Sequence, residues 1–277
     1  MAERHGGPIG LQDVGGEWIV LAGGGCAILL QLAHPSVGRG VAEHSDFASR
    51  PYDRLVGTLT YVTAVACGTQ DDVRAMRRVV DRAHGPVHGG PNRVEPAYTA
   101  FDPDLQLWVT ATLYWTAVRV YERVFGRLDE ASADRVYREF AAVGTSLQLP
   151  TDAWPATRAD FDEYWRDALE HLSVLPAARR VSGDLLRAER APLWMRALMP
   201  WARLATVALL PAELRAQYGL AFTERNRRRY ERMMSLTAAV YPRLPLRIRH
   251  VVRDRLLRRL RSEASRHGWM RRASSLP

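Results

Sequence analysis

The residues best suited to chemistry lie between His34 and His88. A helix is predicted to end at His84, four residues after Val80 and eleven after Val73, which places the imidazole on the apolar stripe of that helix. One histidine on an apolar face suits haem iron, which needs a single axial ligand from the protein, whereas zinc needs three or four. The alternative interpretation is a core or helix-capping histidine.

A second group of candidates lies on the preceding predicted helix. Arg54 and Thr58 are four residues apart and therefore share one face, together with Tyr61 and Val65. Arg54 has the charge to neutralise a haem propionate, although an arginine at a helix start also forms ordinary ion pairs. The polar end of this face is a candidate ligand contact.

The elements that must position these residues are predicted to be helices. Helical periodicity dominates, and neither tandem repeats nor a series of alternating strands is found. Gly68 is expected to end its helix in the left-handed conformation. The predicted helices cover about 22 or 25 to 33, 53–67, 70–84, a long segment from 102, 132–142, a segment after 155, a segment from 223, and 246–267. The fold class is therefore all-α.

Composition excludes several classes of protein. The chain has 277 residues, 47% of them apolar and 25% charged, which excludes a disordered or fibrous chain. No segment has the run of about 18 apolar residues that a membrane span requires. The two cysteines, Cys26 and Cys67, and the absence of a signal-peptide pattern lead us to expect a cytoplasmic protein.

Familiar catalytic motifs are absent from the sequence. It contains no Gly-x-Ser-x-Gly elbow, no Walker-type phosphate loop and no His-Glu-x-x-His metal motif. The glycines at 23–25 lack the strand and acidic partner of a dinucleotide site, so they are predicted to allow close helix packing. The sequence therefore gives little support for a hydrolase or a nucleotide-dependent enzyme.

The positive charge is concentrated at the C-terminal end. The net charge is +9, and residues 225–277 carry 16 Arg against Glu231, Asp254 and Glu263, a net +13 that leaves −4 for residues 1–224. This region could contact an anionic membrane peripherally; nucleic acid is disfavoured because no recognised binding motif is present. The Trp- and Leu-rich segment 192–211 suits either a membrane interface or, preferably, a core helix broken by proline.

Five stretches resemble a known family. They are LLQLAHPSVGRGVAEHSDF, PYDRLVGT, AHGPVHG, YTAFDPDLQLWV and LPAELRAQYGL. Together they are similar to the MpaB-type oxygenase family, which includes the latex-clearing rubber oxygenase, over about residues 20–220. The resemblance implies a helical, globin-like core that holds non-covalent haem b and uses O₂ to cleave a carbon–carbon double bond of an isoprenoid.

The resemblance also implies residue roles. It assigns the axial iron ligand to His84, with His88 as the rival, because His88 follows the helix break. The Arg-x-x-x-Thr pattern falls on Arg54 and Thr58, which would order the cofactor or oxygen on the opposite side of the iron and so act in catalysis.

Four departures from the family pattern stand out. Gly57 occupies the place of a distal lysine, and the sequence contains no lysine at all. Thr110 stands where a histidine is common, and the nearest acids for a distal base are Glu43 and Asp46. The chain is also shorter than the secreted rubber oxygenase, so polyisoprene is not the expected substrate.

Further candidates for the site occupy family-like or helical positions. We expect His34 to cap the first helix and His44 to lie in a polar turn, and we expect structural roles for both to be more common than ligand contact. Either ligand contact or core packing would suit Tyr61, Trp108 and Thr110.

We therefore predict one all-helical domain over residues 1–277, with a family-like core at about 20–220 and a basic helical extension at 223–277. The leading hypothesis is a haem b-dependent oxygenase that acts on an apolar small molecule with O₂. The alternative is a non-catalytic helical protein that binds haem, a membrane or a partner through its basic tail. The oligomeric state is not predicted.

Overall fold

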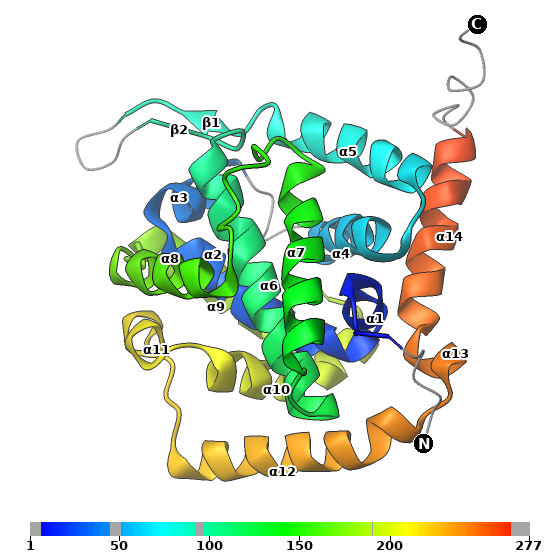
Figure 1. Cartoon of the computed structure of the whole chain (residues 1–277). Coiled ribbons are helices and arrows are strands. Elements are labelled where there is room, and N and C mark those ends of the chain that lie inside the picture. The colour runs from blue at the N-terminus through cyan, green and yellow to red at the C-terminus, as the bar shows by residue number, and fades with distance from the viewer. Residues whose placement is uncertain (1–6, 45–50, 92–96, 190, 267–277) are drawn as a thin grey trace, which may run out of the picture.

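The computed structural model describes residues 7–44, 51–91, 97–189 and 191–266, without the side chains of residues 51–54 and 194. In these residues helices predominate, which confirms the all-α prediction (Figure 1). The helices are α1 (Leu11–Gly15), η1 (Trp18–Gly23), α2 (Gly24–Ala33), α3 (Pro35–His44), α4 (Pro51–Cys67), α5 (Gln70–His84), α6 (Pro103–Phe125), α7 (Glu130–Thr145), α8 (Arg158–Glu170), α9 (Pro176–Arg187), α10 (Leu193–Leu209), α11 (Ala212–Tyr218), α12 (Glu224–Val240), η3 (Tyr241–Arg243), α13 (Leu246–Arg249) and α14 (Val251–Arg266).

Helix α6 runs through the middle of the molecule and packs against η1, α2, α7 and α12 (Figure 1). It begins where the Asp102 carboxylate accepts a hydrogen bond of 2.9 Å from the backbone of Asp104, and Pro103 fits the first turn. Tyr114 lies in the centre of an aromatic cluster, with ring centroids 4.9 to 5.9 Å from those of Tyr137, Phe140, Trp154 and Phe161. Buried residues therefore lie along most of the length of this helix.

The start of α5 is capped and tied to α14. The Asp72 carboxylate accepts a hydrogen bond of 2.9 Å from the backbone of Thr69, and the Thr69 hydroxyl accepts one from the Asp72 backbone. Asp72 is fully buried, and its Oδ2 atom lies 2.8 Å from Nη2 of Arg261 on α14. Helix α14, the last described part of the basic C-terminal region, is thus packed against α4 and α5.

A buried ion pair joins the beginning of the chain to its last helices. Glu17 precedes η1, and its Oε2 atom lies 3.0 Å from Nε of Arg249 at the end of α13. The Tyr241 hydroxyl donates a hydrogen bond of 2.9 Å to the same carboxylate. Both charged side chains are almost completely buried, so each depends on the other.

Two of the three glycines before and within α2 confirm the prediction of close helix packing. A Cβ atom at Gly25 would lie 2.1 Å from the Thr206 hydroxyl of α10, and one at Gly23 would lie 3.2 Å from Thr116 of α6. Gly24 faces open space. Glycine is therefore required at Gly25 because another helix approaches the backbone.

Two local predictions are wrong. Gly68 is not left-handed: in the described residues only Gly126 and Gly219 are glycines with positive φ. Instead, Gly68 continues the helical hydrogen bonding to Ala64, and a Cβ atom there would lie 2.5 Å from the Ala64 carbonyl oxygen. The single helix predicted for 246–267 is interrupted at His250, which leaves the short α13 before α14.

The loop predicted after His84 contains a small hairpin. Two-residue strands β1 (His88–Gly89) and β2 (Tyr98–Thr99) pair antiparallel, with His88 opposite Thr99. In addition, α3 begins directly at Pro35, in a segment for which no helix is predicted.

Taken singly, none of the described helices has both the length and the apolar composition to cross a membrane. Only the segments Trp18–Ala33 and Pro35–His44 meet both criteria together, and they are bent by 102° relative to each other.

Candidate functional site

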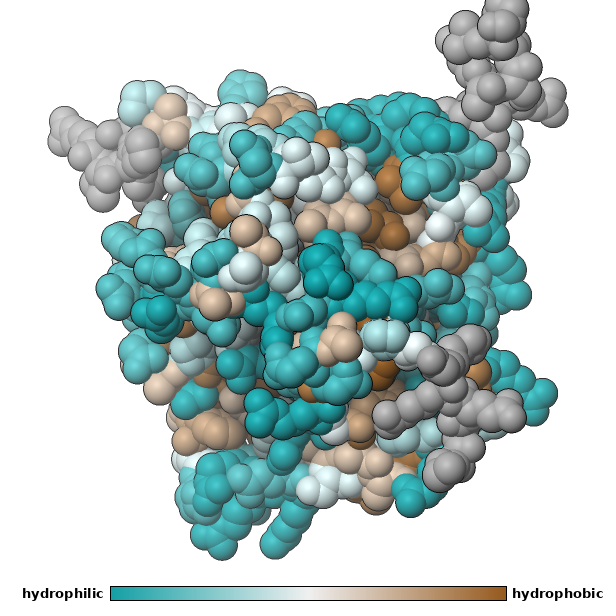
Figure 2. Space-filling model, viewed as in Figure 1, coloured by the Kyte–Doolittle hydropathy of each residue, from teal (hydrophilic) through white to brown (hydrophobic). Residues whose placement is uncertain are grey.

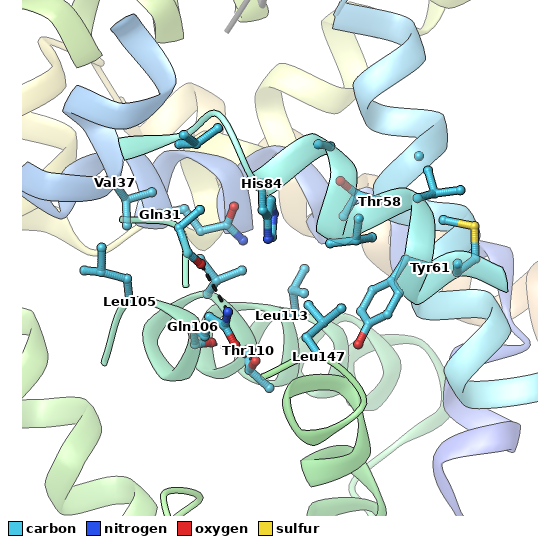
Figure 3. A pocket seen from close by; sticks show the side chains of 18 of the residues that line it. Gln31, Val37, Thr58, Tyr61, His84, Leu105, Gln106, Thr110, Leu113 and Leu147 are labelled. Atoms are coloured by element: carbon cyan, nitrogen blue, oxygen red, sulfur yellow. Dashed lines mark hydrogen bonds between the residues drawn. The ribbon is translucent and has the colours of Figure 1, made fainter. Parts of the chain in front are cut away.

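A cavity of about 820 Å³ lies between α3, α4, α5, α6, α7 and α14 (Figure 3). This volume is within the range of small-molecule and cofactor sites, about 300–1,000 Å³. Most of its wall is apolar, and its apolar lining residues include Val37, Met76, Val80, Leu105, Val109, Leu113, Leu147 and Leu260. The site is therefore a largely apolar chamber with a small number of polar groups.

His84 lies on the wall of this cavity. It is the last residue of α5, and Met76 and Val80 of the same helix line the same wall, so its predicted place on the apolar stripe is confirmed. Figure 3 shows the imidazole pointing from α5 across the cavity toward α6, in the direction of Gln106 and Leu113. The nitrogen atoms of a half-buried imidazole thus face the space where a ligand would bind.

His88, the rival ligand, has a different environment. It lies on β1 beyond the helix break, is exposed, and is not part of the cavity wall. Its ring centroid is 6.3 Å from that of His44, which lies at the end of α3 and does line the cavity.

Helix α4, which packs against α5, contributes Gly57, Thr58 and Tyr61 to the lining. Arg54 lies one turn before Thr58 on this helix, but its side chain is outside the described residues, as is the whole of Asp46. The structure therefore brings Thr58 and His84 to one cavity and gives no position for the Arg54 guanidinium. A Cβ atom at Gly57 would meet no atom within 4 Å, so the absence of a side chain there leaves free space.

Two of the three ligand-or-core candidates line the cavity. Burial raises the pKa of Tyr61, and its hydroxyl donates a hydrogen bond to the carbonyl oxygen of Val143 on α7, so it stays neutral. The Thr110 hydroxyl donates 2.8 Å to the Gln106 carbonyl of its own helix. Trp108 instead packs in the core, where it stacks on Trp165 with ring centroids 5.3 Å apart.

Neither Glu43 nor His34 lines the cavity. Glu43 accepts hydrogen bonds of 2.8 Å from Arg39 and 2.7 Å from the Tyr98 hydroxyl, and these hold its pKa below the ordinary value. His34 is the C-cap of α2, as predicted, and burial lowers its pKa. Glu43 is thus an ionised surface group rather than a base poised inside the site.

A chain of hydrogen bonds that the sequence pattern does not predict lies beside the site. Nε2 of Gln106 donates 2.8 Å to Oε1 of Gln148, and Nε2 of Gln148 donates to the carboxylate of Asp81. Asp81 lies three residues before His84, so these hydrogen bonds tie the end of α5 to α6. The partners are 42 and 67 residues apart in the sequence, and no local pattern indicates such a contact.

The predicted basic extension also reaches the site. Arg259, Leu260 and Glu263 of α14 line the cavity, and Nε of Arg259 lies 2.8 Å from Oε1 of Glu263. Residues beyond the family-like core expected at about 20–220 therefore contribute to the cavity wall.

The described residues contain no group of three or more histidine, cysteine, aspartate or glutamate side chains that could hold a metal ion. A cofactor that brings its own ring of ligands needs only one donor from the protein. The imidazole of His84, which points into this largely apolar chamber, is a donor that fits such a cofactor.

A family model described as the ER-bound oxygenase mpaB/B′ and rubber oxygenase catalytic domain matches residues 12–239. The chain belongs to this family. Membership supports an oxygenase that uses O₂ on a small-molecule substrate. The mpaB/rubber oxygenase match ends before α13 and α14, so one wall of the cavity comes from residues beyond it.

Two curated relatives are uncharacterised proteins of Mycobacterium bovis and Mycobacterium tuberculosis. Each is 36% identical to the chain over 214 residues, which is 76% of this chain and 84% of the relative. No solved structure matches the chain significantly.

Proposed function

We propose that the protein is a haem b-dependent oxygenase that oxidises an apolar small molecule with O₂. One observation carries the proposal: the imidazole of His84 points into a largely apolar cavity of about 820 Å³. Family membership supports the oxygenase part, and the donor set supports haem over a metal held by the protein alone.

In this proposal His84 is the axial ligand and Thr58 contacts the cofactor or oxygen from α4, with Arg54 one turn away. Haem would supply the binding and activation of O₂, and the chain supplies ligation, orientation and exclusion of water. The hydrogen bonds from Gln148 to Asp81 and from Gln106 to Gln148 hold the end of α5, and therefore the imidazole, against α6.

The apolar wall sets the substrate class. Val109, Leu113 and Leu147 offer no charge to a ligand, so a molecule that fills this part of the cavity gains free energy by leaving water. A globin-like arrangement of the core and a single domain that includes α14 are part of the same proposal.

The decisive test measures cofactor content. We expect the purified protein, supplied with haem during expression, to show a Soret band and a stoichiometric pyridine haemochrome. His84→Ala should lose most of the bound haem or shift its spectrum, because the only proposed axial ligand is gone. His88→Ala is the matched control, because this histidine is exposed and outside the cavity, and it should keep the wild-type spectrum.

Loss of haem in His88→Ala with retention in His84→Ala would overturn the ligand assignment. Absence of any Soret band after haem titration would overturn haem dependence itself. For the haem-loaded protein, oxygen consumption with isoprenoid and other apolar compounds tests the oxygenase activity separately from binding.

A further inference from the structure

Exposed apolar side chains gather on α10, α12 and α13. Eight large apolar side chains are exposed among the described residues, and only Phe101 lies outside these three helices. Leu193 is 79% exposed and Trp201 is 58% exposed. The remaining members are Leu198, Leu236, Val240, Leu246 and Ile248. Grouped exposed apolar residues of this kind mark an interaction surface rather than chance exposure.

The same helices carry many arginines and few acids. Residues 191–212 and 232–253 contain no aspartate or glutamate, although the whole chain has 30. The two acids of α12, Glu224 and Glu231, are paired with Arg227 and Arg228. Exposed arginines without an acidic partner among the described residues are Arg196, Arg203, Arg225, Arg229, Arg232, Arg243 and Arg247.

We call these seven apolar residues and seven arginines the basic apolar face. Helix α10 packs against α12, and α13 follows α12 through η3, so the helices that carry this face are neighbours. Helix α12 runs along the lower edge of the molecule in Figure 1. Figure 2 shows apolar side chains beside hydrophilic ones along that edge.

We propose that the basic apolar face docks the protein on an anionic lipid bilayer. A helix that presents leucine, tryptophan and arginine together lies at a membrane interface, with apolar groups inserted among the acyl chains and arginines at the head groups. Because residues 191–212 and 232–253 contain no acid, these segments do not repel anionic lipids. The proposal rests on this surface alone and is independent of haem binding.

This assignment moves the membrane contact away from the most arginine-rich helix. In α14, Arg261 is paired with buried Asp72, and Arg259 faces the cavity beside Glu263. Helix α14 also stands apart from α12 in Figure 1. Arginines of α14 can therefore be replaced as a control, because each replacement removes the same charge at a place outside the basic apolar face.

The test is sedimentation of the full chain with phosphatidylcholine vesicles prepared with and without phosphatidylglycerol. We expect binding only to vesicles that contain phosphatidylglycerol, and weaker binding at high salt. Arg229→Gln/Arg232→Gln should weaken the partition coefficient about tenfold or more, because each basic residue near an anionic surface strengthens binding about fivefold. Leu236→Ser/Val240→Ser should weaken it comparably, with an unchanged melting temperature because both side chains are exposed.

The matched control is Arg255→Gln/Arg258→Gln on α14, where both arginines are exposed and neither is in an ion pair of the described residues. This pair should bind like the wild type. If the control loses vesicle binding equally, the membrane attracts only the net charge of the protein, and the proposal is overturned. Normal vesicle binding of Leu236→Ser/Val240→Ser would also overturn it. Light scattering tests whether a second copy of the chain covers this face instead. If Leu236→Ser/Val240→Ser converts a dimer to a monomer and leaves vesicle binding unchanged, the face joins two copies and the proposal fails.

Discussion

Two glycines, Gly25 in α2 and Gly57 in α4, have opposite roles, which can be tested by the same substitution. Gly25→Ala should destabilise the protein by about 1–3 kcal/mol, because the new methyl group would collide with the buried Thr206 hydroxyl. Gly57→Ala should stabilise it by about 0.5–1 kcal/mol, because an alanine in the middle of α4 meets free space and restricts the unfolded chain. Urea unfolding of both variants measures these changes.

Thr206→Ala combined with Gly25→Ala should recover part of the loss, since it removes the colliding hydroxyl. No loss in Gly25→Ala, or a loss in Gly57→Ala as large as that expected for Gly25→Ala, would contradict this account of the two positions.

How much of the site could be predicted from the sequence differs from residue to residue. The position of His84 on the cavity wall could be predicted because residues close in sequence determine both ends of its helix. Thr69 caps the start, and Gly85 follows the end. The amide chain from Gln106 to Asp81 could not be predicted, because tertiary contacts alone bring these residues together.

The ion pair between α5 and α14 makes a testable contribution to acid stability. Burial on its own raises the pKa of Asp72, but hydrogen bonds from Arg261 and Thr69 outweigh it and hold the pKa below its ordinary value of 3.8. A carboxylate with a lowered pKa in the folded state contributes stability above the pKa of the unfolded chain, and loses it as the pH falls through the folded value. Stability should therefore decline on the acid side of about pH 4.

Asp72→Asn should be less stable than the wild type at neutral pH and should show a shallower decline in acid. Asp71→Asn, one residue earlier and half exposed, is the control and should change both quantities little. Unfolding free energies measured at neutral and acid pH test this prediction, and equal pH slopes for Asp72→Asn and the wild type would refute it.

Among the elements, the best predicted helices have explicit caps and proline or glycine boundaries. α5, α6 and α12 each begin with a side-chain cap that the sequence displays. Helix α3 was not predicted because its glycines at 38 and 40 disfavour a helix, and they are accommodated by close contacts with Ala178 and Tyr98. The break at His250 also depends on tertiary contacts, since Arg249 turns inward to reach Glu17.

For the whole molecule, the Glu17–Arg249 pair joins the two ends of the described chain. Glu17→Ala should lower the free energy of unfolding by about 3–5 kcal/mol, because it leaves a buried guanidinium without its carboxylate. Glu17→Leu/Arg249→Leu should recover much of this loss, because replacing both charges removes the uncompensated one. Denaturant unfolding gives both values, and a double variant no more stable than Glu17→Ala would contradict the pairing.

The wall of the cavity includes residues from Gln31 in α2 to Glu263 in α14, and the part of the chain that follows His84 up to Glu263 is 179 residues long. At about 5–20 residues per second, a ribosome needs roughly 9–36 s to make that stretch. Throughout this interval the nascent chain already carries His84 but lacks the side of the chamber that α14 provides. Any ligand captured during synthesis would therefore be held in an open cleft, and retention begins only when α14 has been made and packs against α4 and α5.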